Sequence, residues 1–287
     1  MKYVTVNVTW FLLVVLLPSL SSAQSARQIM EKYDSVYRKS YSTFYQRMEL
    51  HTCKYTIQQG RMHCSEKPRF VAVEGSRKFY GIDFKSTALV LEPIRDKGIG
   101  LLYNEYYSNK DNDNWIYLPS MGKVKRIISS SDGGTNSFMG TEFTTEDMQT
   151  FKINSYTYKI LGEETYDNRP AWILELIPTP EKVNKTAYSK IIMWLDKERY
   201  IRFREDLYDH RGVLCKRYTL SDYDEVDNVW LARKLMMNNL INHRVSTIYT
   251  KLAAYNIEIP DDFYSNRVLV DFVFREKNME RLRAYMK

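Results

Sequence analysis

Two cysteines and two histidines form the tightest group of potentially reactive side chains in the sequence. Cys53 and Cys64 flank a turn signal at residues 59–60 and would face each other across a hairpin. His51 and His63 stand beside them, so the group could bind zinc as well as form a disulfide bond. His63 and Cys64 are neighbours on one strand and must point to opposite faces. The residues therefore favour a disulfide in an oxidising compartment, and we expect no bound metal.

Other motifs that would carry catalysis are missing from the sequence. None of the four histidines lies in an H-E-x-x-H pattern, and no G-x-S-x-G elbow occurs. Asp111-Asn112-Asp113 resembles the start of a calcium loop, but the later glycine and glutamate of such a loop are absent, which favours a hairpin turn. Cys215 remains as a single thiol outside the cysteine hairpin. These observations indicate a protein that is not an enzyme, and we expect no cofactor.

The N-terminal residues have the pattern of an export signal. Lys2 precedes an apolar stretch from Val4 to Leu17, and the small residues Ser21-Ser22-Ala23 follow. This order of charge, apolar segment and small residues is typical of a cleaved signal peptide. An uncleaved anchor is the alternative, although the stretch is short for a membrane span. We expect residues 1–23 to be removed after Ala23, and residues 24–287 to act as a single domain in the periplasm with a short basic C-terminal tail.

The charge of the chain is moderately positive, with a formal net value of +7. Acids and bases alternate along most of the sequence, and basic residues gather only between Arg275 and Lys287. Because the chain is expected to be exported, we expect no nucleic-acid partner. The basic surface could attract anionic membrane headgroups transiently, or it could simply be a solvated face.

The hydrophobic pattern divides the chain into one helix and a series of strands. Residues 25–49 show apolar side chains at helical spacing behind Ser25, which is a suitable N-cap. After residue 50 the pattern changes to a period of two, with turn signals between the runs. Two runs, 171–177 and 191–195, are apolar on both faces and should be covered on both sides. Short helices are expected near residues 144–148, and a basic helix near residues 275–286. A curved antiparallel sheet around the N-terminal helix would bury both apolar faces.

The most specific pattern lies between Asp113 and Met148. It consists of an aromatic run ending in Pro119, a basic pair at Lys125-Arg126, and a segment rich in Phe, Gly, Thr and acids. The matching residues of the aromatic run and of the last segment are Trp115, Tyr117, Leu118, Pro119, Phe138, Met139, Gly140, Thr141, Phe143, Thr144, Glu146, Asp147 and Met148. Downstream matches are Tyr158, Leu161-Gly162-Glu163, Trp172, Leu174, Pro178, Tyr188, Trp194 and Asp196-Lys197. This order resembles the LolA/LolB-like outer-membrane lipoprotein-sorting family, a superfamily of periplasmic lipoprotein carriers, over most of residues 85–265.

The resemblance implies a fold and a function. The implied fold is mainly β with some α: a half-open antiparallel β-barrel wrapped around an N-terminal amphipathic helix and short plug helices. The implied function is that of a periplasmic chaperone that shields the acyl chains of a lipoprotein, or a lipid, in a hydrophobic cavity and moves it toward the outer membrane. Some relatives are associated with inner-membrane transporters of the resistance-nodulation-division (RND) type, which makes such a transporter a possible partner and a free lipid an alternative cargo.

Aromatic and methionine side chains suit the lining of an acyl cavity, because flat and soft groups adapt to a flexible tail. The candidate lining residues are Trp115, Tyr117, Phe138, Met139, Trp172 and Trp194. Each of them could equally pack the core between sheet and helix. Lys123, Lys125 and Arg126 could contact lipid phosphates or a partner, or could form an outward strand face.

A second function is compatible with the same resemblance. The chain could be a regulatory module that senses a lipid or lipoprotein without transporting it. An enzyme acting on an envelope substrate would need a polar cluster converging in the cavity, which the sequence does not show. A purely structural role is the remaining alternative.

Overall fold

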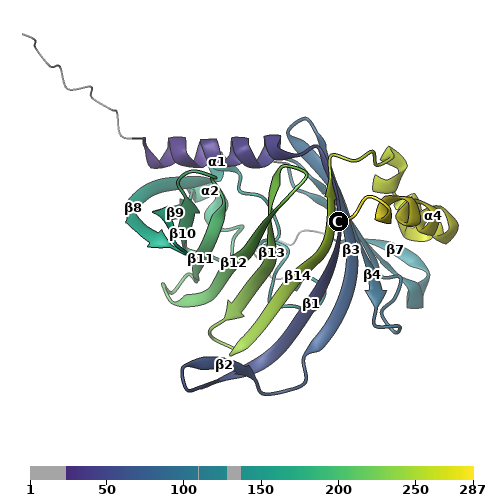
Figure 1. Cartoon of the computed structure of the whole chain (residues 1–287), viewed down its shortest axis with the longest axis horizontal. Helices are drawn as coiled ribbons and strands as arrows, with labels where there is room; N and C mark the ends of the chain where they lie inside the picture. Colours follow the sequence, from purple (N-terminus) through teal and green to yellow (C-terminus); the bar gives the residue numbers. More distant parts are fainter. Residues whose placement is uncertain (1–23, 109, 128–136) are drawn as a thin grey trace, which may run out of the picture.

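The computed structural model describes residues 24–108, 110–127 and 137–287. These residues form a long antiparallel sheet with a few helices (Figure 1). The strands are β1 (Thr43–Gln58), β2 (Arg61–Cys64), β3 (Arg69–Tyr80), β4 (Asp83–Glu92), β5 (Gly100–Glu105), β6 (Asp113–Leu118), β7 (Lys123–Ile127), β8 (Tyr156–Tyr166), β9 (Arg169–Pro178), β10 (Lys190–Asp196), β11 (Arg202–Tyr208), β12 (Leu214–Val226), β13 (Val229–Asn239) and β14 (Arg244–Tyr255). The helices are α1 (Ala26–Ser40), η1 (Pro119–Met121), η2 (Ile153–Ser155), α2 (Pro180–Val183), η3 (Asp261–Tyr264), α3 (Asn266–Val270) and α4 (Phe272–Arg283).

All fourteen strands belong to one sheet that does not close on itself. Its order is β7-β6-β5-β4-β3-β1-β14-β13-β12-β11-β10-β9-β8, with β2 paired to β1 outside this path. Neighbouring strands are antiparallel throughout, and most are joined by short turns. The sheet curls so that α1 extends along its open side, while α4 lies outside it near β4 and β7 (Figure 1). This confirms the predicted open antiparallel sheet.

Alternation along β9 and β10 divides their side chains between two hydrophobic clusters, one on each face of the sheet. On β9 and β10, Leu174 and Met193 belong to the main core on the concave face, whereas Ile173 and Ile192 belong to a smaller cluster on the convex face. Strand β10 is buried on both faces, as its uninterrupted apolar run predicts, whereas β9 is only partly covered on its convex face, where Ile177 is 43% exposed. The main core also takes in the buried face of α1.

Helix α1 is shorter than the sequence pattern suggests. A capping box at Ser25 begins it, Ile29 and Met30 are fully buried, and it ends at Ser40. Residues 43–49, predicted to continue the helix, instead open β1. Phe44 and Met48 are four residues apart, a spacing that fits one face of a helix and one face of a strand equally well. These residues form a strand because they pair with both β3 and β14.

The C-terminal helices cover the convex face of β1, β4 and β5. Their core contains Leu89, Phe263, Leu269 and Leu282, each at most 2% exposed. An ion pair lies inside this layer, because Arg283 Nε on α4 donates to both carboxylate oxygens of Glu74 at 2.9 and 3.0 Å. The basic helix predicted at residues 275–286 is thus present as α4, displaced by a few residues and fixed to the sheet.

Within the described residues, no helix has the length and apolar character needed to cross a bilayer.

Candidate functional site

A pocket opens between the concave face of the sheet and the segment formed by residues 137–152. The described structure gives it a cavity volume of about 130 Å³. Strands β1, β3, β4, β5 and β6 form its wall, and the segment closes it from the other side. Its apolar lining residues are Phe44, Met48, Phe84, Ala88, Tyr103, Phe138 and Met148. Segment 137–152 is called the plug segment below.

Strand periodicity explains why these residues meet. Phe84, Ser86 and Ala88 alternate along β4 and all line the pocket, and Phe44, Gln46 and Met48 do the same on β1. Between them lies Gly75 of β3, where an added Cβ would stand 3.2 Å from Met48 Cε. A glycine therefore allows the thioether of Met48 to lie across β3 and form part of the lining.

Two charged side chains lie in the pocket wall. The Arg77 guanidinium stacks over the Phe84 ring at 3.9 Å and hydrogen-bonds the Tyr37 hydroxyl. Glu105 is 7% exposed and accepts a 3.1 Å hydrogen bond from the backbone of Thr150 in the plug segment. Burial raises the pKa of Glu105, and the nearby Arg77 charge opposes this shift only in part. The pocket thus combines an apolar wall with a partly buried cation and a buried carboxyl group whose pKa is raised.

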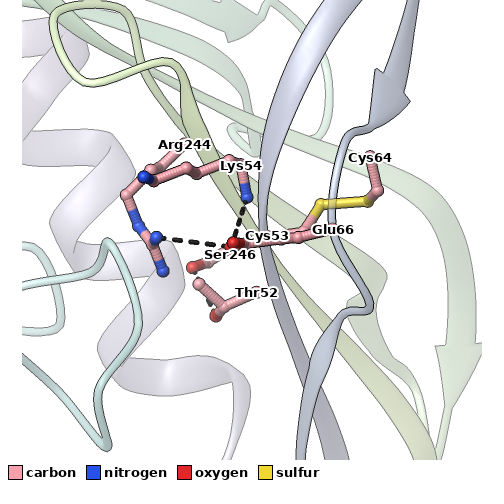
Figure 2. Close-up of a disulfide and its surroundings, with 7 residues drawn as sticks. All are labelled: Thr52, Cys53, Lys54, Cys64, Glu66, Arg244 and Ser246. Atoms are coloured by element: carbon pink, nitrogen blue, oxygen red, sulfur yellow. Dashed lines mark hydrogen bonds and ion pairs between the residues drawn. A yellow bond between two sulfur atoms is a disulfide. The ribbon is translucent and has the colours of Figure 1, made fainter.

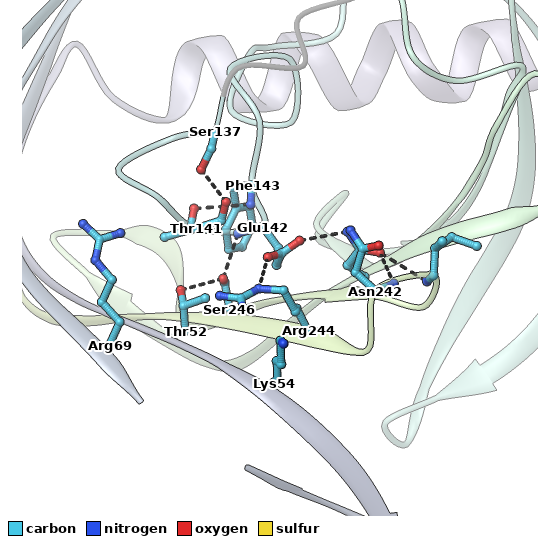
Figure 3. Close-up of polar contacts among 12 residues, drawn as sticks. Thr52, Lys54, Arg69, Ser137, Thr141, Glu142, Phe143, Asn242, Arg244 and Ser246 are labelled. Atoms are coloured by element: carbon cyan, nitrogen blue, oxygen red, sulfur yellow. Dashed lines mark hydrogen bonds and ion pairs between the residues drawn. The ribbon is translucent and has the colours of Figure 1, made fainter. Parts of the chain in front are cut away.

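Glu142 attaches one end of the plug segment to the sheet (Figure 3). Its carboxylate accepts from Arg244 Nε at 2.8 Å and from Asn239 Nδ2 at 2.8 Å. Its backbone N–H donates to Ser246 Oγ at 2.8 Å. Next to it, Phe143 is fully buried against the ring of Tyr218. The segment is therefore fixed by two buried aromatic side chains, Phe138 and Phe143, and by polar contacts around them.

Asp147 provides the second attachment. Lys216 Nζ donates to it at 2.9 Å, and the Tyr188 hydroxyl at 2.6 Å. Thr144 and Asp147 also exchange hydrogen bonds between side chain and backbone, which closes a turn over residues 144–147. The sequence predicts short helices here, but residues 145–148 form turns.

Gly140 shows why the resembling pattern has a glycine at this position. Its φ of +71° is a left-handed conformation, and a Cβ there would lie 1.8 Å from Arg69 Nη1. Arg69 Nη1 in turn donates to the Met139 carbonyl at 2.8 Å. Phe138, Gly140, Thr144 and Asp147 of the pattern thus shape and hold the plug segment, and only part of the pattern lines the pocket.

The two hairpin cysteines are joined by a disulfide bond between β1 and the end of β2 (Figure 2). Glu66, just beyond Cys64, accepts from the Lys54 backbone at 2.9 Å and lies 3.5 Å from Arg244 Nη1. Arg244 therefore lies between Glu66 of the cysteine hairpin and Glu142 of the plug segment. The disulfide fixes one side of this carboxylate–guanidinium–carboxylate arrangement.

The six aromatic and methionine candidates divide between the two faces of the sheet. Phe138 lines the pocket, Met139 packs beside the same core, and Trp172 belongs to the concave core. Trp115 and Tyr117 instead pack under the C-terminal helices, and Trp194 belongs to a convex cluster. The physical reason is strand alternation, since Asn114 and Ile116 take the inward positions of β6 that their aromatic neighbours would need.

The basic candidates lie on the edge strand β7. Lys123 and Lys125 are exposed, and Arg126 forms an ion pair with Asp113. They do not line the pocket. The pocket residues that the sequence analysis missed, above all Met48, Phe84 and Ala88, lie in the strands before residue 90, where alternation was the only available signal.

The described residues contain no cluster of three or more His, Cys, Asp or Glu side chains that could hold a metal ion. Cys215 is a half-buried free thiol whose pKa is raised by burial.

Comparisons with known proteins identify chains of the same fold. A family model described as "uncharacterized protein" matches residues 83–271, more than half of the chain. The structure of a DUF1329 family protein from Desulfovibrio piger has a TM-score of 0.74 and 24% identity, covering 85% of this chain and 97% of that one. A putative outer membrane lipoprotein-sorting protein domain from Vibrio parahaemolyticus has a TM-score of 0.73 and 24% identity, covering 85% and 98%.

A LolA superfamily protein from Nitrosomonas europaea is also similar, with a TM-score of 0.62 and 17% identity over 84% of this chain and 97% of that one. No curated protein matches the sequence.

Proposed function

We propose that this chain, which belongs to the family whose model matches residues 83–271 and shares its fold with a putative lipoprotein-sorting domain and a LolA superfamily protein, is a periplasmic carrier of acyl chains. Its pocket would shield the acyl chains of a lipoprotein, or of a lipid, between the concave face and the plug segment. The observation that carries the proposal is the apolar pocket wall of β1, β3, β4 and β5, closed by a segment that combines buried aromatic side chains with polar contacts to the sheet.

The size of the pocket makes the plug segment part of the proposal. A volume of about 130 Å³ is below the roughly 300–1,000 Å³ of sites that enclose a whole small ligand. A long acyl chain therefore enters only if the plug segment moves away from the sheet. Burying each CH₂ group contributes about 0.8 kcal/mol, so a long chain supplies on the order of 10 kcal/mol toward this movement. The arrangement of the plug segment against the sheet is then the closed form of the carrier.

The polar contacts of the plug segment suit reversible opening. Hydrogen bonds to charged groups contribute about 1.5–3 kcal/mol each while they exist, and water replaces them when they break. The buried rings of Phe138 and Phe143 would be exposed by the same movement, so an acyl chain that covers them would favour the open state. Glu142 and Asp147 thus hold the closed state without making the open state prohibitively costly.

The proposal also covers the export of the protein, its location and its partner. We propose that residues 1–23 are removed, that the mature chain acts in the periplasm, and that an RND-type transporter of the inner membrane supplies cargo for the outer membrane. N-terminal sequencing of the periplasmic protein should begin at Gln24. A chain that still starts at Met1 would contradict the cleavage.

Filling the pocket tests the proposal directly. Ser86→Phe places a ring in the pocket, whereas Thr219→Phe adds the same ring at a half-buried position of β12 that does not line it. We expect Ser86→Phe to weaken binding of a fluorescent palmitoyl probe at least tenfold, and Thr219→Phe to leave it within twofold. Circular dichroism and thermal unfolding establish that both variants are folded, and Ala88→Leu serves as a milder pocket-filling variant. Equal binding by all variants would refute an acyl site here.

A further inference from the structure

Three chain segments meet at one buried arginine at the end of the sheet that carries β4 to β7. Arg275 of α4 is 6% exposed, and its Nη2 would lie 3.8 Å from a Cβ on Gly98, in the turn between β4 and β5. The same Cβ would lie 3.3 Å from Cγ of Pro119 in the β6–β7 turn. Arg275 Nη1 also donates to the Leu269 carbonyl at 3.5 Å, which ties in α3. The two turns and the junction of α3 with α4 are thereby held next to one another.

Each of these segments presents an exposed apolar side chain. Ile94 in the first turn is 84% exposed, and Met121 in the second turn is 45% exposed. At the helix junction, Val270, Phe272 and Val273 are 55%, 57% and 77% exposed. Single exposed apolar residues are common on soluble proteins, but five of them on three adjoining segments form a patch that requires an explanation.

Basic residues accompany this patch. Lys97 follows Ile94, Lys123 follows Met121, and Lys277 lies one turn after Val273 on α4. All three are exposed, and no ion pair within the described part of the chain involves them. Three acids beside the patch pair with arginines: Asp96 with Arg69 and Arg95, Asp271 with Arg267, and Glu276 with Arg275. The patch therefore combines protruding apolar side chains with three exposed lysines, and Glu280 is an exposed acid beside them on α4.

We propose that this patch, formed by Ile94, Met121, Val270, Phe272 and Val273 with its three lysines, docks the protein on the surface of an anionic phospholipid bilayer. Apolar side chains on turns and helix ends can enter the boundary between headgroups and acyl chains. Lysines around them gain from the negative surface potential. A protein partner would have to supply a matching acidic, apolar groove, whereas an anionic membrane offers both features at once. The proposal is independent of the cargo pocket, which lies on the opposite face of the same strands.

The position of the patch also suits the movement of cargo. The C-terminal helices cover the convex face of β4 and β5, and the cavity lies on the concave face of these strands. Docking through the patch would leave the plug segment free to open. The rigid attachment of α4 through Arg283 and Glu74 would transmit the orientation of the bound helix to the whole sheet.

Vesicle flotation tests the proposal on the whole mature chain. We expect the protein to float with vesicles of 30% phosphatidylglycerol in phosphatidylcholine, and to detach as salt is raised. Phe272→Ser with Val273→Ser should lower the bound fraction at least tenfold. Ile57→Ser with Ile241→Ser changes two similarly exposed isoleucines on distant hairpins and serves as the control, expected to bind as wild type.

The contribution of the lysines to membrane binding is tested with two matched double variants. Lys97→Gln with Lys123→Gln should weaken flotation several-fold, whereas Lys39→Gln with Lys159→Gln removes equal charge from exposed positions of α1 and β8 and should have little effect. Failure of the wild-type chain to float, or equal losses in the control variants, would overturn the proposal. Concentration-dependent self-association abolished by Phe272→Ser, without flotation, would instead assign the patch to a second copy. Palmitoyl-probe binding is measured separately, so failure of the pocket and failure of the patch are distinguishable.

Discussion

At the scale of single residues, the best-connected acid of the described structure is the last residue of β10, before the turn to β11. The Asp196 side chain is fully buried and accepts from Arg169 Nε at 2.5 Å, from Arg199 Nε at 3.0 Å and from the backbone of Glu198 and Arg199 at 2.8 Å. Burial alone would raise its pKa, but these donors outweigh burial and lower the pKa from 3.8 to about 2. The acid Asp196 of the resembling pattern thus has a structural explanation that needs no ligand.

This lowered pKa predicts a defined dependence of stability on pH. A carboxyl whose folded pKa lies below its unfolded pKa stabilises the fold above the unfolded value, and this contribution disappears as pH falls through the folded value. Asp196→Asn should therefore lose about 2 kcal/mol of unfolding free energy at pH 7. The difference from wild type should shrink between pH 4 and pH 2. Urea unfolding across this range measures it, with the exposed Asp224→Asn as control. A difference that stays constant with pH would contradict the assignment.

Glu142 is the residue on which closure of the plug segment depends most clearly. Glu142→Gln keeps the size of the side chain but removes the charge that faces Arg244. We expect faster hydrogen exchange in residues 138–149 and a loss of about 1–2 kcal/mol in unfolding free energy. Glu163→Gln, which removes a 56% exposed partner of Lys197, should change neither quantity measurably. Unchanged exchange in Glu142→Gln would mean that the buried aromatic side chains and the Asp147 contacts hold the segment without the charge of Glu142.

At the scale of elements, α4 is positioned by one buried charge pair. Arg283→Met would leave the fully buried carboxylate of Glu74 with only the Tyr45 hydroxyl as a hydrogen-bond donor. Removing one partner of a buried pair typically costs about 3–5 kcal/mol. Since Arg283 itself is partly exposed, we expect the lower end of that range and detachment of α4 before global unfolding. Arg281→Met, two residues earlier on an exposed face, should have little effect. Thermal unfolding and limited proteolysis near residue 283 compare them.

The elements also show how far sequence reasoning reaches. The apolar runs of β9 and β10, the cysteine hairpin and the basic C-terminal helix were predictable, because each depends on local periodicity or a turn signal. The end of α1 was not, because the spacing of Phe44 and Met48 fits both periods. The sequence also leaves open which face of β6 meets the pocket. Trp115 and Tyr117, both candidates for the lining, lie on the convex face instead.

At the scale of the whole molecule, the plug segment was the least predictable feature. Its place depends on contacts such as Glu142 with Arg244, which are about a hundred residues apart in the sequence. The pattern in residues 113–148 that resembles the LolA/LolB-like family includes this segment, but it does not indicate what the segment does. The structure assigns much of the pattern to holding the segment, through Gly140, Thr144 and Asp147. The pocket wall comes largely from strands before residue 90, where alternating residues carry no distinctive motif.

The two proposals describe one molecule with separate surfaces for cargo and membrane. The open sheet leaves a concave side for the acyl chain and a convex side for the helices that carry the patch. Because the sheet is continuous from β7 to β8, the two surfaces keep a fixed relation to each other. A carrier of this design would approach a bilayer with its helices while its cavity remains accessible from the other face.

The central claim is that an acyl chain occupies the pocket behind the plug segment, and photo-crosslinking tests it most directly. A palmitoylated peptide with a diazirine near the end of its acyl chain would be irradiated with the mature protein, and the adducts mapped by mass spectrometry. We predict adducts on pocket residues such as Met48, Ala88 and Met148, which disappear in Ser86→Phe and persist in Thr219→Phe. Adducts confined to the outer patch around Phe272, or unchanged by Ser86→Phe, would contradict an acyl carrier built on this cavity.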